Sequence, residues 1–246
     1  MNGTKADMTG GAATDGMHEG ALRMGRILRT EVAALDGFVG GFRSSQVTLF
    51  DSDSAYASEL LHLLCVRAVA GFDEEVVWID GGNAVEPYTL GSICRRLRLD
   101  RREVLSRVNV ARAFTAYQFV SLVEERLEEE VARSTPAAVI VSSATDLFMD
   151  KDMKWMEAYQ LLRRCAEVVS RVTEEHETVT LVTAHTPGRG CPDPRMTALL
   201  SDRSDEVVQM RDRREGLLFR LPKHGRSMVF SPRPWNQATL AEFGEG

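Results

Sequence analysis

The sequence predicts an α/β fold with a mostly parallel sheet, helices on both faces of that sheet and an antiparallel edge near the C-terminus. Short, fully apolar runs alternate with amphipathic segments through most of the 246 residues. This alternation is typical of parallel strands joined by covering helices. Three more short runs follow at the C-terminal end with only turns between them, which favours antiparallel pairing.

The alternating pattern places each element in order along the chain. The predicted parallel strands are residues 46–50, 75–80, 107–110, 137–142 and 178–183. The predicted helices are residues 21–35, 54–70, 87–96, 115–132 and 153–174. The antiparallel edge is predicted at residues 206–211, 216–221 and 226–230. We expect Gly225 to close the last turn, because glycine adopts a positive φ without strain.

Composition bounds the class of protein. Hydrophobic residues make up 43% of the chain, charged residues 27%, and the mean hydropathy is -0.20. These are ordinary globular values, and no apolar run approaches the ~18 residues of a membrane-spanning helix. The N-terminus shows no secretion-signal pattern, so we expect a cytoplasmic protein. A net charge of -6 argues against a surface that binds nucleic acid all over.

The cysteines and the N-terminal residues complete this outline. Four cysteines are scattered singly, which favours buried free thiols over a zinc site or a disulfide framework: Cys65, Cys94, Cys165 and Cys191. Residues 1–20 are rich in small and polar residues without periodicity, which predicts a disordered tail. Residues 21–246 are predicted to form a single domain.

Four segments together resemble a known family. They are Val77-Trp78-Ile79-Asp80 followed by Pro87, the stretch 104–114 (VLSRVNVARAF), the stretch 140–148 (IVSSATDLF), and Leu35-Asp36 leading to Gly40-Gly41. Over about residues 33–232 the chain resembles the RadA-type recombinases, the archaeal and eukaryotic branch of the RecA superfamily. The resemblance implies a RecA-like core. Only about thirty residues precede that core, so the chain is similar in this respect to the RadB-type paralogues.

The segment that corresponds to the family's phosphate-binding loop has lost most of its motif. Such a loop needs glycines, a lysine for the phosphate charge and a Ser or Thr for magnesium. Here Asp51 and Tyr56 stand in the glycine positions, Ala57 in the lysine position, and only Ser58 is retained. Asp53 adds a second carboxylate. One interpretation is that the residues of this segment cap the following helix, and the other is an unorthodox anion site.

Two further positions of the nucleotide site are altered. The strand 137–142 ends in Ser142 where the family has a magnesium-binding aspartate, and Asp146 four residues later is expected to be a surface charge. The position of the family's water-activating glutamate is Gly82. Glu86 lies nearby, beside Pro87, where it is expected to cap a helix. The sequence therefore predicts a pseudo-ATPase with no catalytic residue, no cofactor and no metal.

Other features at the strand ends suggest weaker sites. Gly81-Gly82-Asn83 forms a tight turn where α/β sheets bind ligands, so it is either a crevice wall or a structural turn. His185 falls where the family has its Thr-Asn-Gln signature, and a metal site with Cys191 is not expected.

The family's two DNA-facing loops correspond to residues 149–155 and 186–195. The residues expected to face DNA are Lys151, Lys154, Trp155, Arg189 and Arg195. Arginine clusters at 95–102 and 211–233 can follow a phosphate backbone, or they form an ordinary solvated surface with the acidic residues among them. The solvated surface is the favoured interpretation of each cluster, weak sequence-independent DNA binding is the alternative, and sequence-specific readout is not expected.

These observations leave three hypotheses for function. The first is a RadA- or RadB-like accessory protein of recombination or repair that contacts a RadA-type recombinase or another RecA-like protein. The second is a non-enzymatic KaiC-like regulatory module. The third is a residual ATP-binding protein or slow ATPase that uses Ser58, Glu86 and residues of a partner. No F-x-x-A polymerisation tetrapeptide occurs in the sequence, so self-filamentation is not expected.

Overall fold

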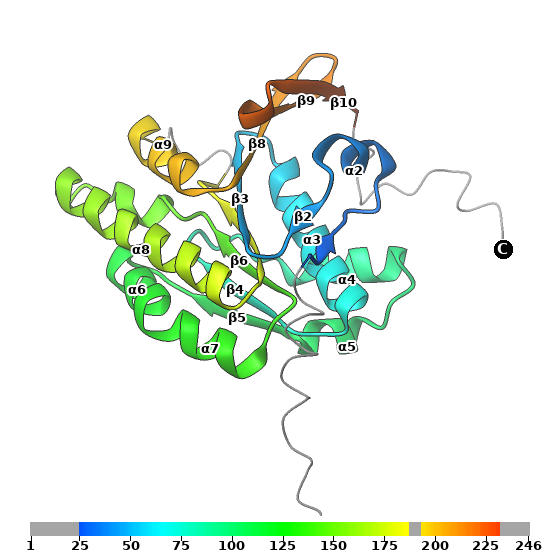
Figure 1. Cartoon of the computed structure of the whole chain (residues 1–246), viewed down its shortest axis with the longest axis horizontal. Coiled ribbons are helices and arrows are strands. Elements are labelled where there is room, and N and C mark those ends of the chain that lie inside the picture. The colour runs from blue at the N-terminus through cyan, green and yellow to red at the C-terminus, as the bar shows by residue number, and fades with distance from the viewer. Residues whose placement is uncertain (1–24, 187–192, 232–246) are drawn as a thin grey trace, which may run out of the picture.

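The computed structural model describes residues 25–186 and 193–231, which contain an eight-stranded sheet with helices on both faces (Figure 1). The strand order is β10-β9-β8-β3-β7-β6-β4-β5. The pairs from β8 to β5 are parallel, whereas β8–β9 and β9–β10 are antiparallel. The predicted fold class, with its antiparallel C-terminal edge, is confirmed.

The strands coincide closely with the apolar runs of the sequence. The bounds in the large sheet are β3 Gln46–Ser52, β4 Val76–Asp80, β5 Val108–Arg112, β6 Ala138–Ser142, β7 Val179–Thr183, β8 Glu206–Arg213, β9 Gly216–Leu221 and β10 Arg226–Phe230. Every residue of β4, β6 and β7 is buried. Burial on both faces is the reason that these strands are apolar without alternation.

The helices form two layers that bury two separate apolar cores. One layer contains α2 Ala33–Val39, α3 Tyr56–Phe72, α4 Pro87–Arg96 and α5 Arg101–Ser106. The other contains α6 Ala116–Ser121, the π-helical turn η1 Leu122–Arg126, α7 Leu127–Ser134, α8 Trp155–Glu175 and α9 Pro194–Arg203. Figure 1 shows α6, α7 and α8 on the face of the sheet opposite α3 and α4. No helix among the described residues combines the length and the apolar composition needed to cross a bilayer.

The helix predicted at residues 21–35 is wrong within the described part of the chain. Residues 27–28 instead form the short strand β1, which pairs with β2 Phe42–Arg43, and α2 begins only at Ala33. The Asp36 carboxylate accepts hydrogen bonds from the backbone N–H groups of Thr30 and Glu31 at 2.9 and 2.8 Å. This side chain holds the preceding residues in a non-helical turn. The predicted tail, residues 1–20, lies outside the described residues.

The C-terminal turn forms as predicted. Residues Pro222–His224 make one 3-10 turn, and Gly225 follows with a φ of 61°. Helices α5 and α9 were not predicted from the sequence, nor was the β1–β2 pair, whose strands have two residues each. Three of the four cysteines, Cys65, Cys94 and Cys165, are buried free thiols as predicted, and Cys191 lies outside the described residues.

Candidate functional site

The carboxyl ends of β3, β7, β6 and β4 meet at one edge of the sheet, where a cavity of about 350 Å³ opens. Parallel strands bring their carboxyl ends to the same edge, and this is where α/β sheets hold ligands. The first turn of α3 and the loop between β4 and α4 form two walls of the cavity. The segment after β7 forms a third.

Asp80 fixes the loop after β4. Its side chain is fully buried and accepts hydrogen bonds from Ala84 N at 2.9 Å, Val85 N at 3.2 Å and Ser142 Oγ at 3.0 Å. Arg112 Nε donates to the same carboxylate at 3.0 Å. Burial by itself raises the pKa of Asp80, but the hydrogen bonds from Ala84, Val85, Ser142 and Gly82 outweigh it and bring the pKa below its usual value. Asp80 is therefore an ionised anchor for the cavity wall.

The buried side chain of His62 links two walls of the cavity, the first turn of α3 and the loop before α4. Its Nδ1 lies 2.7 Å from the carbonyl oxygen of Ser58, and its Nε2 accepts a hydrogen bond from Glu86 N at 2.9 Å. The Nε2 atom must be unprotonated to accept this bond, so the proton is on Nδ1 and donates to Ser58. Burial lowers the pKa of His62, and this outweighs the Ser58 carbonyl and the carboxylates of Glu86 and Asp80, which raise it.

The structure corrects the interpretation of Asp51. This side chain neither caps α3 nor faces the cavity, because Arg211 on β8 donates to its carboxylate at 2.8 Å and Gln209 at 3.1 Å. The neighbouring strand β8 therefore binds this negative charge. Asp53 is 61% exposed and lies 3.9 Å from the Arg211 guanidinium, so it does not cap the helix either.

The N-cap residue of α3 is Ala55, which makes no side-chain capping bond, and of the predicted capping residues Ser54 alone reaches the helix, where its Oγ accepts a hydrogen bond from Tyr56 N at 3.2 Å. Tyr56 itself packs away from the cavity, with its ring edge-on to Phe219 at 6.3 Å and tilted against Phe230 at 6.0 Å. Ala55, Ala57 and Ser58 are the residues of the altered loop segment that line the cavity. Asp51, Asp53 and Tyr56 are not brought there.

Ser142 and Gly82 lie next to the cavity but do not line it. Ser142 accepts a hydrogen bond from Trp78 Nε1 at 2.9 Å and donates to Asp80, so it is part of the buried support. Gly82 packs against Ser143 and Thr186 of the facing wall. A Cβ atom at position 82 would overlap Ser143 and lie 2.5 Å from Thr186 Oγ1. The turn at residues 81–83 is thus both structural and a boundary of the cavity.

Two expectations about nearby carboxylates have different outcomes. Glu86 caps α4 as predicted, accepting from Tyr88 N at 3.4 Å, and it also lines the cavity. Asp146 is not a free surface charge, because its carboxylate accepts the backbone N–H of Thr186 at 3.1 Å. It therefore holds the segment after β7 in place.

Several residues that line the cavity, among them Ser143 and Thr186, were not predicted from the sequence, whereas His185 was singled out at its strand end. Ser143 follows β6 with a φ of 56°, and its Oγ lies 2.7 Å from Thr186 Oγ1. Thr183 and His185, at the end of β7, complete this wall, and His185 Nδ1 is buried with no hydrogen-bond partner among the described residues. The signal that identifies them is position alone, since they come directly after the carboxyl ends of buried parallel strands.

The structure brings together part of the predicted DNA-facing set. The Arg195 guanidinium lies over the Trp155 ring at 3.9 Å, and Asp193 accepts from both side chains, from Trp155 Nε1 at 3.0 Å and from Arg195 Nη2 at 2.7 Å. The Arg195 side chain lowers the pKa of Asp193 to about 2, so this pair is ionised and its charges offset each other. Lys151 and Lys154 are exposed, and Arg189 lies outside the described residues.

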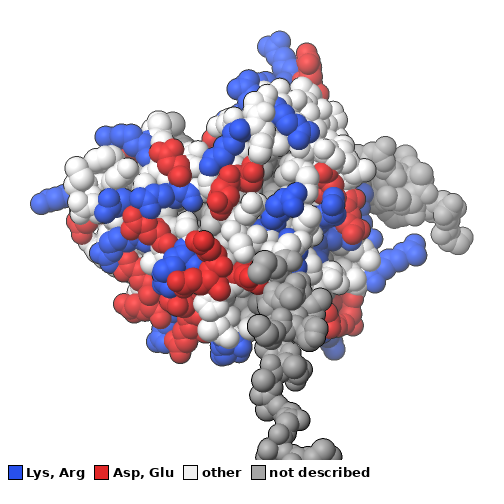
Figure 2. Space-filling view, in the orientation of Figure 1, with Lys and Arg blue, Asp and Glu red and all other residues white. Residues whose placement is uncertain are grey.

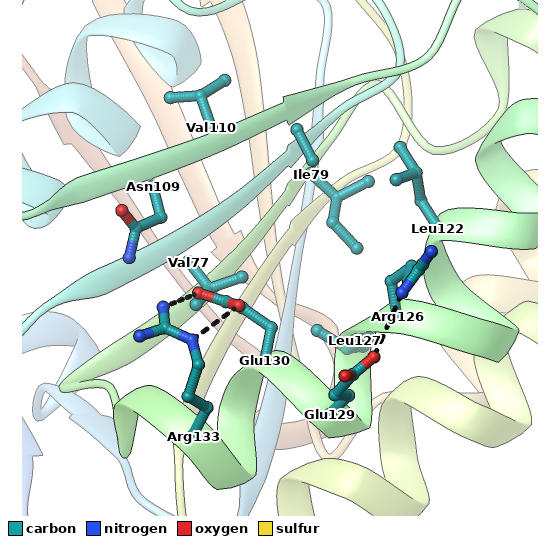
Figure 3. Close-up of a pocket in the computed structure, with 11 residues that line it drawn as sticks. Val77, Ile79, Asn109, Val110, Leu122, Arg126, Leu127, Glu129, Glu130 and Arg133 are labelled. Carbon is teal, nitrogen blue, oxygen red and sulfur yellow. Dashed lines mark hydrogen bonds and ion pairs between the residues drawn. The ribbon is translucent and has the colours of Figure 1, made fainter.

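A second concave feature lies beside β5, the outermost strand at one side of the sheet. It is bounded by β5 and the helix α7. This groove, the β5 groove, has a volume of about 470 Å³. Figure 3 shows Val77 and Ile79 of β4 at its base, and Leu122 and Leu127 on the helical side. The ion pairs Arg126–Glu129 and Arg133–Glu130 form its rim.

The strand order, the two helical layers and the cavity at the carboxyl edge define a RecA-like α/β core. A family model described as Rad51 matches residues 26–190, which is more than half of the 246 residues. The chain therefore belongs to the Rad51 family, of the RecA/RadA recombinase type.

This membership corrects the prediction that the chain is not an enzyme. The Rad51 family is a recombinase and ATPase family, so the class to which the chain belongs is an enzyme class. The prediction rested on a few positions of the nucleotide motif, whereas the family match covers residues 26–190, which include five of the eight strands of the large sheet, β3 to β7. The altered motif positions therefore do not remove the chain from this family.

The family implies a nucleoside triphosphate at the carboxyl-edge cavity. Position 57 holds Ala rather than Lys, and the described residues that line the cavity include Glu59 and Glu86 but no Lys or Arg. The lining therefore does not reproduce the cationic grip on phosphate that the family motif provides. Ser58 is the residue retained from the family motif, and the fold places it in the cavity wall.

Proposed function

We propose that this chain is an accessory protein of DNA recombination or repair that binds a RecA-like protein, such as a RadA-type recombinase, in the β5 groove. Membership of the Rad51 family supports the process, and the open edge of β5 supports the mode of action. Among the described strands β5 pairs with β4 alone. Its outer backbone groups are therefore available to a strand from a partner.

The lining of the groove suits a strand that carries a large apolar side chain. Val77, Ile79 and Leu127 give an apolar base, and Ala111 on β5 is small enough to leave room above it. A strand added to β5 would direct every second side chain toward this base. Backbone hydrogen bonds would then supply affinity, and the inserted side chain would supply specificity.

The charged rim favours a selective partner. Arg126 lies 3.3 Å from Glu129, and Arg133 is bound to Glu130, so each charge at the rim has an opposite charge beside it. Such pairs discriminate between partners more than they add affinity. The groove thus combines an apolar centre with a polar border, as protein interfaces do.

The proposal is tested by measuring the affinity of the purified full chain for a purified RadA-type recombinase by isothermal titration calorimetry. Ala111→Glu places a carboxylate against Ile79 and is expected to weaken binding at least tenfold, which is about 1.4 kcal/mol. Leu122→Gln tests the helical side of the groove independently. Tyr88→Glu is the matched control, because this side chain is 82% exposed on α4 and lies outside the groove.

Equal affinity of the groove variants and the Tyr88 control would exclude the β5 groove as the docking site. No heat of binding with the unmodified chain would exclude the recombinase as the partner and favour the KaiC-like regulatory alternative.

A second candidate function, weak sequence-independent DNA binding, is favoured by the exposed Lys151 and Lys154 beside Trp155. Fluorescence anisotropy with a labelled oligodeoxythymidine at 50 and 200 mM salt tests it. Lys151→Glu with Lys154→Glu is expected to remove the binding and its salt dependence. Binding that is unchanged in the double variant would exclude this surface.

A further inference from the structure

The C-terminal end of the sheet concentrates positive charge on an acidic protein. Residues 211–230, here called the basic hairpin, hold six Lys and Arg side chains and two acidic ones, although the chain has a net charge of -6. Figure 2 shows blue side chains around the top of the molecule, where Figure 1 places β9 and β10, and red ones gathered lower down near α6 and α7. Basic side chains also lie elsewhere on this face, but in the basic hairpin they outnumber the acidic ones by six to two.

The two faces of the basic hairpin differ in what covers them. One face is buried, with Met210 and Phe219 in the core beside α3. The pairing register puts Arg211, Leu218 and Val229 in one row on the other face, because directly paired residues share a face. Val229 is 55% exposed, so the outer part of this second face is open.

Three arginines lie on the open face, two on β8 and one on β9. Arg211, Arg213 and Arg220 all lie on this face, since Arg213 is two residues from Arg211 and Arg220 pairs with Gln209. Arg211 is bound to Asp51. Arg213 and Arg220 are exposed and form no ion pair with any described residue. Two guanidinium groups are thus available to an external carboxylate.

The strand β10 offers a backbone to the same partner. It is the terminal strand of the sheet and pairs with β9 alone among the described strands. The N–H and C=O groups on its outer side can therefore bind an added strand. Val229 and Leu218 provide apolar contacts beside the arginines.

We propose that the basic hairpin binds an acidic, extended segment of a partner protein, which adds as a strand to the outer edge of β10. Carboxylates on the open side of that segment would face Arg220 across the small side chain of Ser227 on β10, and Arg213 on β8 adds to the positive potential of the same face. This surface is at the opposite edge of the sheet from the β5 groove, so the two proposals are independent.

The observations favour a protein segment over nucleic acid. The open face carries no aromatic side chain among its described residues, so it offers no ring on which bases can stack. A long polyanion would also extend beyond the basic hairpin over a protein of net charge -6, which repels it. A short acidic strand matches both the length and the local charge of the hairpin.

The test uses the full chain and a fluorescein-labelled octapeptide of alternating Glu with Val or Thr, followed by fluorescence anisotropy. The double variant Arg213→Glu, Arg220→Glu is expected to weaken peptide binding at least tenfold. The control double variant Arg95→Glu, Arg102→Glu has the same change in net charge at exposed arginines of α4 and α5, and it should bind as the unmodified chain does. The same peptide with Lys in place of Glu should not bind.

Strand addition has its own readout. Amide hydrogen exchange in residues 226–230 should slow when the acidic peptide is present and should stay unchanged with the Lys peptide. The proposal is overturned if the unmodified chain does not bind the acidic peptide, or if both double variants lose binding equally. Tighter binding of an oligodeoxythymidine that is lost only in the Arg213, Arg220 variant would also overturn it, and would identify the surface as a nucleic-acid site.

Discussion

Ser142 donates a hydrogen bond from Oγ to the carboxylate of Asp80 at 3.0 Å, across the carboxyl ends of the neighbouring strands β6 and β4. The same Oγ accepts from Trp78 Nε1 at 2.9 Å, and all three side chains are fully buried. One hydroxyl therefore satisfies two buried polar groups that have no access to water. It supports the loop that forms a wall of the cavity.

Ser142→Ala is expected to lower the free energy of unfolding by about 2 kcal/mol, because Trp78 Nε1 loses its acceptor and Asp80 loses a donor. Urea denaturation at pH 7 measures this change. Ser121→Ala is the control, since its hydroxyl makes an exposed hydrogen bond to Glu125 and its removal should change stability by less than about 0.5 kcal/mol. Equal stability of the two variants would contradict the role of Ser142.

The pKa of His62 predicts how stability depends on pH. Burial lowers this pKa in the folded state, so between its ordinary value near 6.5 and the lowered value the unfolded chain binds the proton and the folded chain does not. The stabilising contribution is present above about pH 6.5 and is lost as the pH falls toward the folded pKa. Loss of the bond from Glu86 N to Nε2 is the structural reason.

His62→Gln removes the titrating group and is expected to flatten the dependence of the free energy of unfolding on pH between about 7 and 5.5. Urea denaturation at several pH values measures the slope, which for one group does not exceed about 1.4 kcal/mol per pH unit. His176→Gln leaves His62 in place and should retain the slope of the unmodified chain. A slope that survives in His62→Gln would show that another group titrates.

Gly82→Ala is expected to destabilise the protein by about 1–3 kcal/mol, because the added methyl group overlaps Ser143 and lies 2.5 Å from Thr186 Oγ1. Thermal unfolding followed by circular dichroism measures the effect. Gly71→Ala is the matched control, since Gly71 is exposed in α3 with no atom within 4 Å of the added carbon. There alanine is the better helix former, and stability should rise by up to about 1 kcal/mol.

The order of strands and covering helices could be predicted because burial on both faces leaves a local pattern in the sequence. The runs that end in Asp80, Ser142 and Thr183 became β4, β6 and β7 within one residue at either end. The helix predicted at residues 21–35 failed because Asp36, which lies beyond it, binds the backbone of Thr30 and Glu31. A hydrogen bond of this kind has no periodicity that a sequence pattern can show.

The candidate site was predictable in its location and only partly in its members. Glu86 as a helix cap follows from the Pro beside it, and the strand ends follow from the parallel pattern. The direction of the Asp51 side chain could not be predicted, since it depends on Arg211, which is 160 residues later and reaches it only when β8 pairs with β3. Patterns of neighbouring residues therefore could not identify Arg211 as the partner of the Asp51 carboxylate.

The sequence by itself determined the α/β class, the antiparallel C-terminal edge and the similarity to RecA-type recombinases, because hydrophobic periodicity and short motifs are properties of contiguous residues. The tertiary structure alone decided which side chains share a wall of the cavity, which charges are paired, and which two edges of the sheet remain open. These depend on strand order, and strand order is set by packing between segments far apart in the chain.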